Sequence, residues 1–203
     1  MAAAKPTYHH DNLEQKLLDA AAEIVASQGV AALSLRALGE VAGVSRSAPY
    51  HYFADKDALL HSLGERGFTL LAEATEAAEA GHVDPVARGR AGMRGYLRFA
   101  QTNPQLFRLM FAGVLPRRLS LPLGDAGSHY NFSSSAAAKA FARMQSGVAA
   151  LPDSAGLDSQ ALMLRTNTIW AAVHGVAILA IDENLKLVAP ELVIEALLDR
   201  LIG

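Results

Sequence analysis

The sequence contains no cysteine, and its 203 residues also lack other features that mark particular protein classes. Without thiols there can be no disulfide framework, thiolate zinc site, iron–sulfur cluster or cysteine nucleophile. The first residues lack the apolar run of a signal peptide. The most apolar segment, 166–181, includes Asn167 and His174 and is short for a membrane span. We therefore expect a cytoplasmic protein with no membrane, metal or cofactor partner.

An excess of positive charge is also missing. Residues 1–60 hold five Lys or Arg against seven Asp or Glu, and the whole chain carries a formal net charge of −2. Because many nucleic-acid-binding domains are basic, a role of that kind must depend on where the few cations lie.

Strand patterns are scarce, whereas apolar residues recur at helical spacing along most of the chain. Leu13, Leu17, Ala21 and Ile24 form one such stripe, which Gly29 ends. Ser34 is expected to cap a helix ending near Ala42, Ser45 a short helix to about Phe53, and Asp55 a long helix. Predicted helices cover 34–42, 45–53, 56–79, 85–102, 104–111, 128–150, 158–182 and 190–202, with a loop at 113–127. The predicted fold is all-α, with a head of residues 1–56 and a body of residues 57–203.

Residues 34–53 read as helix, glycine turn and short polar helix, which is the order of a helix-turn-helix. Gly43 allows the tight turn, and the second helix would enter the major groove of DNA. Arg46 and His51 can donate hydrogen bonds to phosphates or base edges, and Tyr50 suits a phosphate contact. The pattern therefore predicts DNA binding.

The segment SLRALGEVAGVSRSAPYHYFADKDALL resembles the helix-turn-helix of the tetracycline-repressor (TetR) family of bacterial regulators. The resemblance implies that Arg46, Ser47 and Ala48 lie at the groove, and that Tyr50, His51 and Lys56 grip the DNA. Pro49 departs from the family pattern, which usually has leucine there, and Tyr52 replaces a commoner histidine. The predicted DNA-binding residues are Ser34, Arg36, Ser45, Arg46, Ser47, Ala48, Tyr50, His51, Tyr52 and Lys56.

The resemblance extends more weakly into the body, where YLRFAQTNPQLFRLMF and IWAAVHGVAILA resemble a subclass named for a Trp…His-Gly motif. It implies an all-helical body that dimerises and binds a small-molecule inducer. The helix predicted at 158–182 is apolar almost all round, which indicates that a symmetry mate covers it together with the last helix. The predicted interface residues are Ile169, Val173, Val176, Ala180, Leu197 and Leu201.

An apolar interior with a few polar groups is predicted to form the inducer pocket. Its predicted lining residues are Phe99, Phe107, Met110, Phe111, Met163, Asn167, Trp170 and His174. The alternative is a fully packed core with a hydrogen-bonded histidine, in which case the body would bind a protein partner. A remote alternative is a helical enzyme with His174 as general base, although no nucleophile, metal or paired carboxylate accompanies it.

Two repeated spacings in 85–102 bear on packing. Gly89, Gly92 and Gly95 form a small-residue edge that allows a neighbouring helix to approach closely. Arg90, Arg94 and Arg98 share one face, which we interpret as solvated, with a docking surface for an acidic ligand or partner as the alternative. The leading hypothesis is a repressor that binds a double-stranded palindromic operator as a homodimer and is released by a small, mostly apolar molecule.

Overall fold

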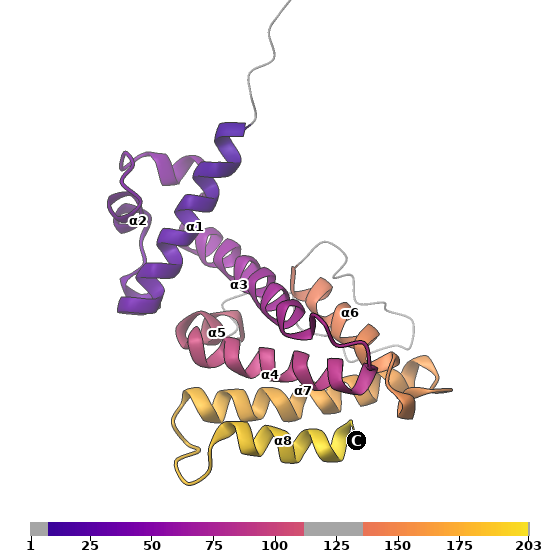
Figure 1. Ribbon diagram of the computed structural model, residues 1–203. Helices are drawn as coiled ribbons and strands as arrows, with labels where there is room; N and C mark the ends of the chain where they lie inside the picture. Colours follow the sequence, from indigo (N-terminus) through magenta and orange to yellow (C-terminus); the bar gives the residue numbers. More distant parts are fainter. Residues whose placement is uncertain (1–7, 112–135, 203) are drawn as a thin grey trace, which may run out of the picture. The chain divides into compact units, whose positions relative to one another are not determined.

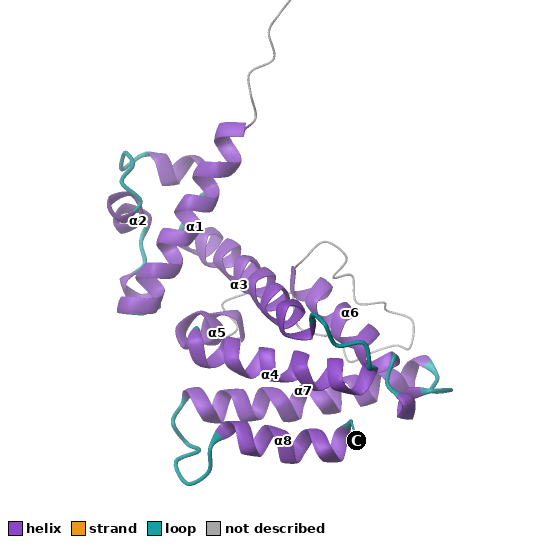
Figure 2. Ribbon diagram, in the orientation of Figure 1, coloured by secondary structure: helices purple, strands orange, loops and turns teal. Residues whose placement is uncertain are grey.

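The computed structural model describes residues 8–111 and 136–202, with side chains from residue 13 onward. Within these residues the regular structure is helical and no strand occurs, which confirms the all-α prediction (Figure 2). In chain order (Figure 1), the elements are α1 (Tyr8–Gln28), η1 (Val30–Ala32), α2 (Leu35–Val41), η2 (Ala48–His51), α3 (Lys56–Glu79), α4 (Pro85–Thr102), α5 (Pro104–Phe111), α6 (Ala136–Ala149), η4 (Pro152–Ser154), α7 (Ser159–Ile181) and α8 (Pro190–Leu201).

Two of the predicted helices begin at a residue whose side chain caps the helix. The Ser34 hydroxyl accepts a hydrogen bond from the Ala37 N–H at 3.1 Å, and an Asp55 carboxylate oxygen accepts one from the Ala58 N–H at 2.8 Å. Both residues are therefore the N-caps that the sequence predicts. The predicted bounds of α3, α4 and α5 are confirmed. The predicted loop at 113–127 and the first part of the helix predicted at 128–150 lie outside the described residues.

The chain divides into two compact units, and the division differs from the predicted boundary at residue 56. Unit 1 comprises Met1–Gly67 and Gln105–Leu121, and unit 2 comprises Phe68–Pro104 and Pro122–Gly203. Helix α3 contributes residues to both units, and nearly all of α5 belongs to unit 1. A Cβ built on Gly67 would lie 2.7 Å from Met110 Cγ, so the glycine allows α5 to pack directly on α3.

The core of unit 1 is formed by apolar side chains of α1, α2 and α3, together with Phe53 after η2. Leu17, Leu38, Phe53 and Leu59 are each 1% exposed or less. Burying a side chain of this size contributes about 1.5–3 kcal/mol, so four of them supply much of what holds a small helical unit together. The buried ring of Phe53 also anchors the chain to this core directly after η2.

Helix α7 forms the centre of unit 2. It packs against α4, α6 and α8, and Figure 1 shows α4, α7 and α8 side by side. Among the described residues, α7 is the one helix that is long and apolar enough to cross a membrane. Three helices of unit 2 cover part of its surface, and 28% of its most apolar window is buried.

Two glycines bring α4 against α3 within unit 2. A Cβ built on Gly95 would lie 2.8 Å from Ala78 Cβ, and one built on Gly92 would lie 2.6 Å from a Glu79 carboxylate oxygen. Any larger residue at Gly95 would push the two helices apart. The predicted small-residue edge is confirmed at these two positions, whereas Gly89 makes ordinary contacts only.

Arginines of α4 pair with carboxylates of α8. Arg90 donates to Glu195 at 2.9 Å and to Asp199 at 2.6 Å, and Arg94 donates to Glu195 at 2.8 Å. The interpretation of this face as solvated is therefore wrong for Arg90 and Arg94. These hydrogen bonds, chiefly that from Arg94, lower the pKa of Glu195 to about 2 despite some desolvation. The pairs hold α8 against α4.

Candidate nucleic-acid interface and ligand cleft

A glycine in the left-handed region reverses the chain after α2. Gly43 has φ 66°, its N–H donates to the Glu40 carbonyl, and the Val44 N–H donates to the Gly39 carbonyl. This pair of hydrogen bonds is a Schellman motif, which satisfies carbonyls that the helix end leaves free. The predicted turn is confirmed, and it directs residues 45–53 back past α2.

The segment after the turn is not the regular helix predicted for 45–53. Only Ala48–His51 is helical, as a short 3-10 helix with Pro49 near its start. Ser45 does not cap it; the Ser45 hydroxyl instead lies 3.2 Å from that of Ser47. Proline lacks an N–H donor, so an α-helical hydrogen bond from this position to the Ser45 carbonyl cannot form. The Ala48 N–H donates to that carbonyl instead, which gives the tighter turn.

Pro49 is buried and lies against α2. A Cβ built on Gly39 would lie 3.3 Å from the Ser45 carbonyl oxygen and 3.6 Å from Pro49 Cγ. Gly39 therefore allows α2 and the following turn to pack closely. With Pro49 buried, the next residue, Tyr50, is turned outward and is 58% exposed.

Most of the predicted DNA-binding residues are exposed and follow one another closely along the chain. We call this exposed set the turn surface: Ser34, Arg36, Ser45, Arg46, Ser47, Tyr50 and His51. Ala48, Tyr52 and Lys56 are half-buried. The turn surface offers hydroxyl groups, guanidinium groups and an imidazole, which are the donors that contact phosphates and base edges.

A glutamate lies among these donors. Glu40 Oε1 is 3.5 Å from Arg46 Nη2 and 3.7 Å from Arg36 Nε. The two distances fit ion pairs rather than hydrogen bonds, and all three side chains are more than half exposed. Sequence analysis missed this residue, although it is the one acidic residue in 34–53.

Lys56 has a structural partner in unit 1. Its ammonium group donates to the Val30 carbonyl at 3.2 Å and so ties the start of α3 to η1. An ammonium group has three N–H donors, so this bond leaves others for a phosphate.

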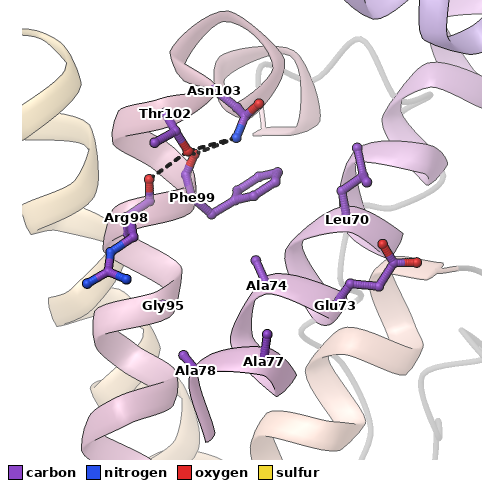
Figure 3. Close-up of a pocket in the computed structure, with 10 residues that line it drawn as sticks. All are labelled: Leu70, Glu73, Ala74, Ala77, Ala78, Gly95, Arg98, Phe99, Thr102 and Asn103. Carbon is purple, nitrogen blue, oxygen red and sulfur yellow. Dashed lines mark hydrogen bonds between the residues drawn. The ribbon is translucent and has the colours of Figure 1, made fainter. Parts of the chain in front are cut away.

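Unit 2 contains a cleft of about 530 Å³ between α3 and α4. It lies beside the close crossing at Gly95, and Figure 3 shows Phe99 and Leu70 extending into it from opposite helices. Arg98 and Glu73 line its rim, and their charged ends point away from the gap in Figure 3. The lining residues are Leu70, Glu73, Ala74, Ala77, Ala78, Gly95, Arg98, Phe99, Thr102 and Asn103.

The eight residues predicted to line one pocket are divided between the two units. Phe99, in unit 2, lines the cleft between α3 and α4. The three from α5, Phe107, Met110 and Phe111, belong to unit 1, where the rings of Phe107 and Phe111 lie 4.9 Å apart. The remaining four, Met163, Asn167, Trp170 and His174, are half-buried on α7 in unit 2.

Tyr96, which sequence analysis missed, connects Trp170 and His174. Trp170 Nε1 lies 3.4 Å from the Tyr96 hydroxyl oxygen, which is 2.8 Å from His174 Nδ1. An indole N–H can only donate, so the tyrosine accepts there and can donate its proton to an unprotonated Nδ1. Burial lowers the pKa of His174 and raises the pKa of Tyr96, which keeps both groups neutral near pH 7.

The predicted dimer-interface residues are largely inside the chain. Ile169, Val173 and Val176 are 4% exposed or less because α7 presents them to its neighbours within unit 2. Their assignment to a subunit interface is wrong, since buried side chains cannot face a partner. Ala180, Leu197 and Leu201 are half-buried. The exposed apolar side chains of these helices are Leu164, Ala171 and Leu179 on α7 and Leu192 and Ala196 on α8.

Comparison with known protein families places both parts of the chain. Residues 17–63 match the model of bacterial regulatory proteins, tetR family, and residues 89–203 match that of the tetracyclin repressor-like C-terminal domain. No curated relative matches the sequence.

Solved structures share the fold over nearly the whole chain. A protein of unknown function from Rhodococcus sp. RHA1 is 29% identical with a TM-score of 0.75, and 97% of each chain is covered. A TetR-like transcriptional regulator from the same organism is 18% identical with a TM-score of 0.60, covering 94% of this chain and 93% of that one. The fatty acid degradation regulator FadR from Bacillus halodurans is 12% identical with a TM-score of 0.64, covering 99% and 97%. Because the two family models together span most of the sequence, the chain belongs to the TetR family of bacterial transcriptional regulators.

Proposed function

We propose that this TetR-family regulator is a repressor that binds a palindromic operator as a homodimer and leaves it when a small apolar molecule binds. The observation that carries the proposal is the turn surface, where exposed arginines, hydroxyl groups and Tyr50 follow a Schellman turn. In a helix-turn-helix the segment after the turn meets base edges. Arg46 is the residue proposed to read a base, and Tyr50 the residue proposed to hold a phosphate.

The exposed apolar side chains of unit 2 support the homodimer. Leu164, Ala171 and Leu179 recur at helical spacing along α7, and Leu164 is 69% exposed. Leu192 adds to this apolar surface from α8, which packs against α7. A two-fold interface uses the same patch on both copies, so this one stripe suffices to form it. A dimer also doubles the number of phosphates contacted.

The cleft between α3 and α4 is the proposed effector site. Its volume falls within the range typical of small-molecule sites, and its walls combine alanines, a leucine and a phenylalanine ring with the polar residues Thr102 and Asn103. The small alanine side chains of α3 leave a shallow wall opposite Phe99, which suits a thin or planar apolar molecule. This open cleft favours a small molecule over the alternative of a protein partner.

Helix α3 supports coupling between effector binding in the cleft and release of the operator. It begins at Lys56, beside the turn surface in sequence, and its later residues Leu70, Ala74 and Ala77 line the cleft. An effector that binds the cleft best in a DNA-incompetent conformation would shift the population away from DNA. A tenfold loss of operator affinity needs about 1.4 kcal/mol of such coupling.

The experiment starts from duplexes selected by the purified protein from a random-sequence library. We expect a palindrome bound by two chains, as judged by footprinting and sedimentation, and release of the duplex by some members of a panel of aromatic and aliphatic compounds. Ala77→Phe should fill the cleft and abolish release while operator binding persists. Glu76→Phe places the same ring on α3 outside the cleft lining and serves as the control.

The outcomes separate the parts of the proposal. If the wild-type chain selects no sequence, the operator is excluded. If Ala77→Phe and Glu76→Phe respond alike to a releasing compound, the effector site lies elsewhere. Leu164→Glu should give a monomer, whereas Leu187→Glu, in the exposed segment between α7 and α8, should leave the dimer intact.

A further inference from the structure

Glu40 occupies an unexpected place for an acidic side chain. It is the one Asp or Glu in residues 34–53, and its Oε1 lies within ion-pair distance of both Arg36 and Arg46. A carboxylate on a surface that meets phosphates opposes binding by charge repulsion. An isolated exposed glutamate could be neutral for function, but this one is paired with the two arginines of the turn surface.

Arg36 and Arg46 can still bind another anion, although Glu40 lies within ion-pair distance of both. Separations of 3.5 Å and 3.7 Å, with all three side chains more than half exposed, describe pairs that water and salt weaken. A phosphate can therefore displace Glu40, but the arginine then exchanges one anion for another. The carboxylate that remains faces the phosphate backbone without its partner.

We propose that Glu40 is a specificity-determining residue that lowers affinity for arbitrary DNA more than affinity for the operator. The proposal rests on the proposed DNA-binding function of the turn surface. Arbitrary DNA is held mainly through phosphates, so each arginine engaged by Glu40 reduces the counterion release that drives such binding.

When Arg46 contacts an operator base, Glu40 lowers the affinity by less than it does on arbitrary DNA. A guanidinium group carries five N–H donors in a planar fork. Arg46 can therefore keep the Nη2 edge near Glu40 and present its remaining donors to the N7 and O6 acceptors of a guanine. Glu40 then also restricts the rotation of the Arg46 side chain and favours the orientation that reads the base.

The test compares Glu40→Gln with the wild-type chain on two duplexes, one of arbitrary sequence and one selected from a random library. For the arbitrary duplex we expect affinity to rise about fivefold, the scale of an exposed ion pair, and the salt slope to steepen by about one unit. Affinity for the selected duplex should rise less than about twofold, so the ratio of the two affinities falls.

Two controls isolate the role of Glu40. Glu23→Gln on α1 makes the same charge change outside residues 34–53 and should leave the affinity ratio unchanged. In a background with Arg36→Ala and Arg46→Ala, Glu40→Gln should raise affinity for the arbitrary duplex by less than it does with both arginines present, because only direct repulsion between the carboxylate and the phosphates then remains.

A ratio that stays constant, or an effect of undiminished size after loss of both arginines, would overturn the proposal and leave DNA binding itself intact. Failure of the wild-type chain to bind either duplex would instead exclude the DNA-binding function.

Discussion

Two glutamates of this protein each lie between two arginines, and they differ in what the arginines can do. Glu195 accepts hydrogen bonds of 2.9 Å and 2.8 Å from Arg90 and Arg94, with its side chain 34% exposed. Glu40 lies 3.5 Å or more from its two arginines on the turn surface, with its side chain 56% exposed. Short, shielded pairs hold helices together, whereas long, solvated pairs leave the cations available to another anion.

The largest effect expected from this contrast is on DNA binding by Arg46→Ala. If Arg46 reads a base, operator affinity should fall by about 1–3 kcal/mol, and discrimination at one base pair should relax. The thermal midpoint should stay unchanged because the Arg46–Glu40 pair is exposed. Fluorescence titration of the selected duplex measures the first effect and circular dichroism the second. A lower midpoint would show that the pair in unit 1 is structural.

Arg90→Ala should have the reverse profile. Removing this mostly buried side chain (19% exposed) leaves Asp199 without its hydrogen bond from Arg90 and strips packing from α8, at a cost of about 1–2 kcal/mol. For a chain of this size the midpoint should fall by a few degrees. Arg36→Ala removes an equally charged but exposed arginine and should change the midpoint by much less. If Arg90→Ala and Arg36→Ala lowered the thermal midpoint equally, the arginine pairs of Glu195 and Glu40 would not differ in their contribution to stability.

The smallest effect concerns acid. The pKa of Glu195 lies at about 2 in the folded chain, below its ordinary value of 4.5, mainly because Arg94 donates to it. A lowered folded-state pKa contributes stability above pH 4.5, and that contribution is lost as pH falls from 4.5 toward 2. Urea unfolding between pH 7 and pH 3 should therefore show a smaller acid loss in Glu195→Gln than in the wild type. If both proteins lost the same stability between pH 7 and pH 3, the lowered pKa of Glu195 would be contradicted.

The residues that sequence analysis placed correctly are those governed by local rules. The Ser34 and Asp55 caps and the Gly43 turn need only neighbouring backbone groups, so type and spacing predict them. The helix predicted at 45–53 failed for an equally local reason, because Pro49 forbids one hydrogen bond and the chain tightens into a 3-10 turn.

The residues that were placed wrongly depend on tertiary packing. Helix α7 is apolar on all sides, so its composition cannot show which side packs within the chain and which side could face a second subunit. Val173 and Val176 were assigned to the subunit interface but are buried within the chain. The pairing of α4 with α8 was within reach. Arg90, Arg94 and Arg98 repeat every four residues, and Glu191, Glu195 and Asp199 repeat at the same interval with opposite charge. Matching the two patterns would have predicted that the helices lie together.

The position of α5 has a consequence for protein engineering. Unit 1 is discontinuous in sequence, because α5 packs on Gly67 through Met110 although the whole of α4 separates them along the chain. A chimaera made with one crossover directly after residue 67 would combine Gly67 of α3 with an α5 from another parent. Replacing residues 1–67 together with 105–111 keeps Gly67 and Met110 from a single parent. Transfer of unit 1 as a whole between two relatives therefore needs two grafted segments.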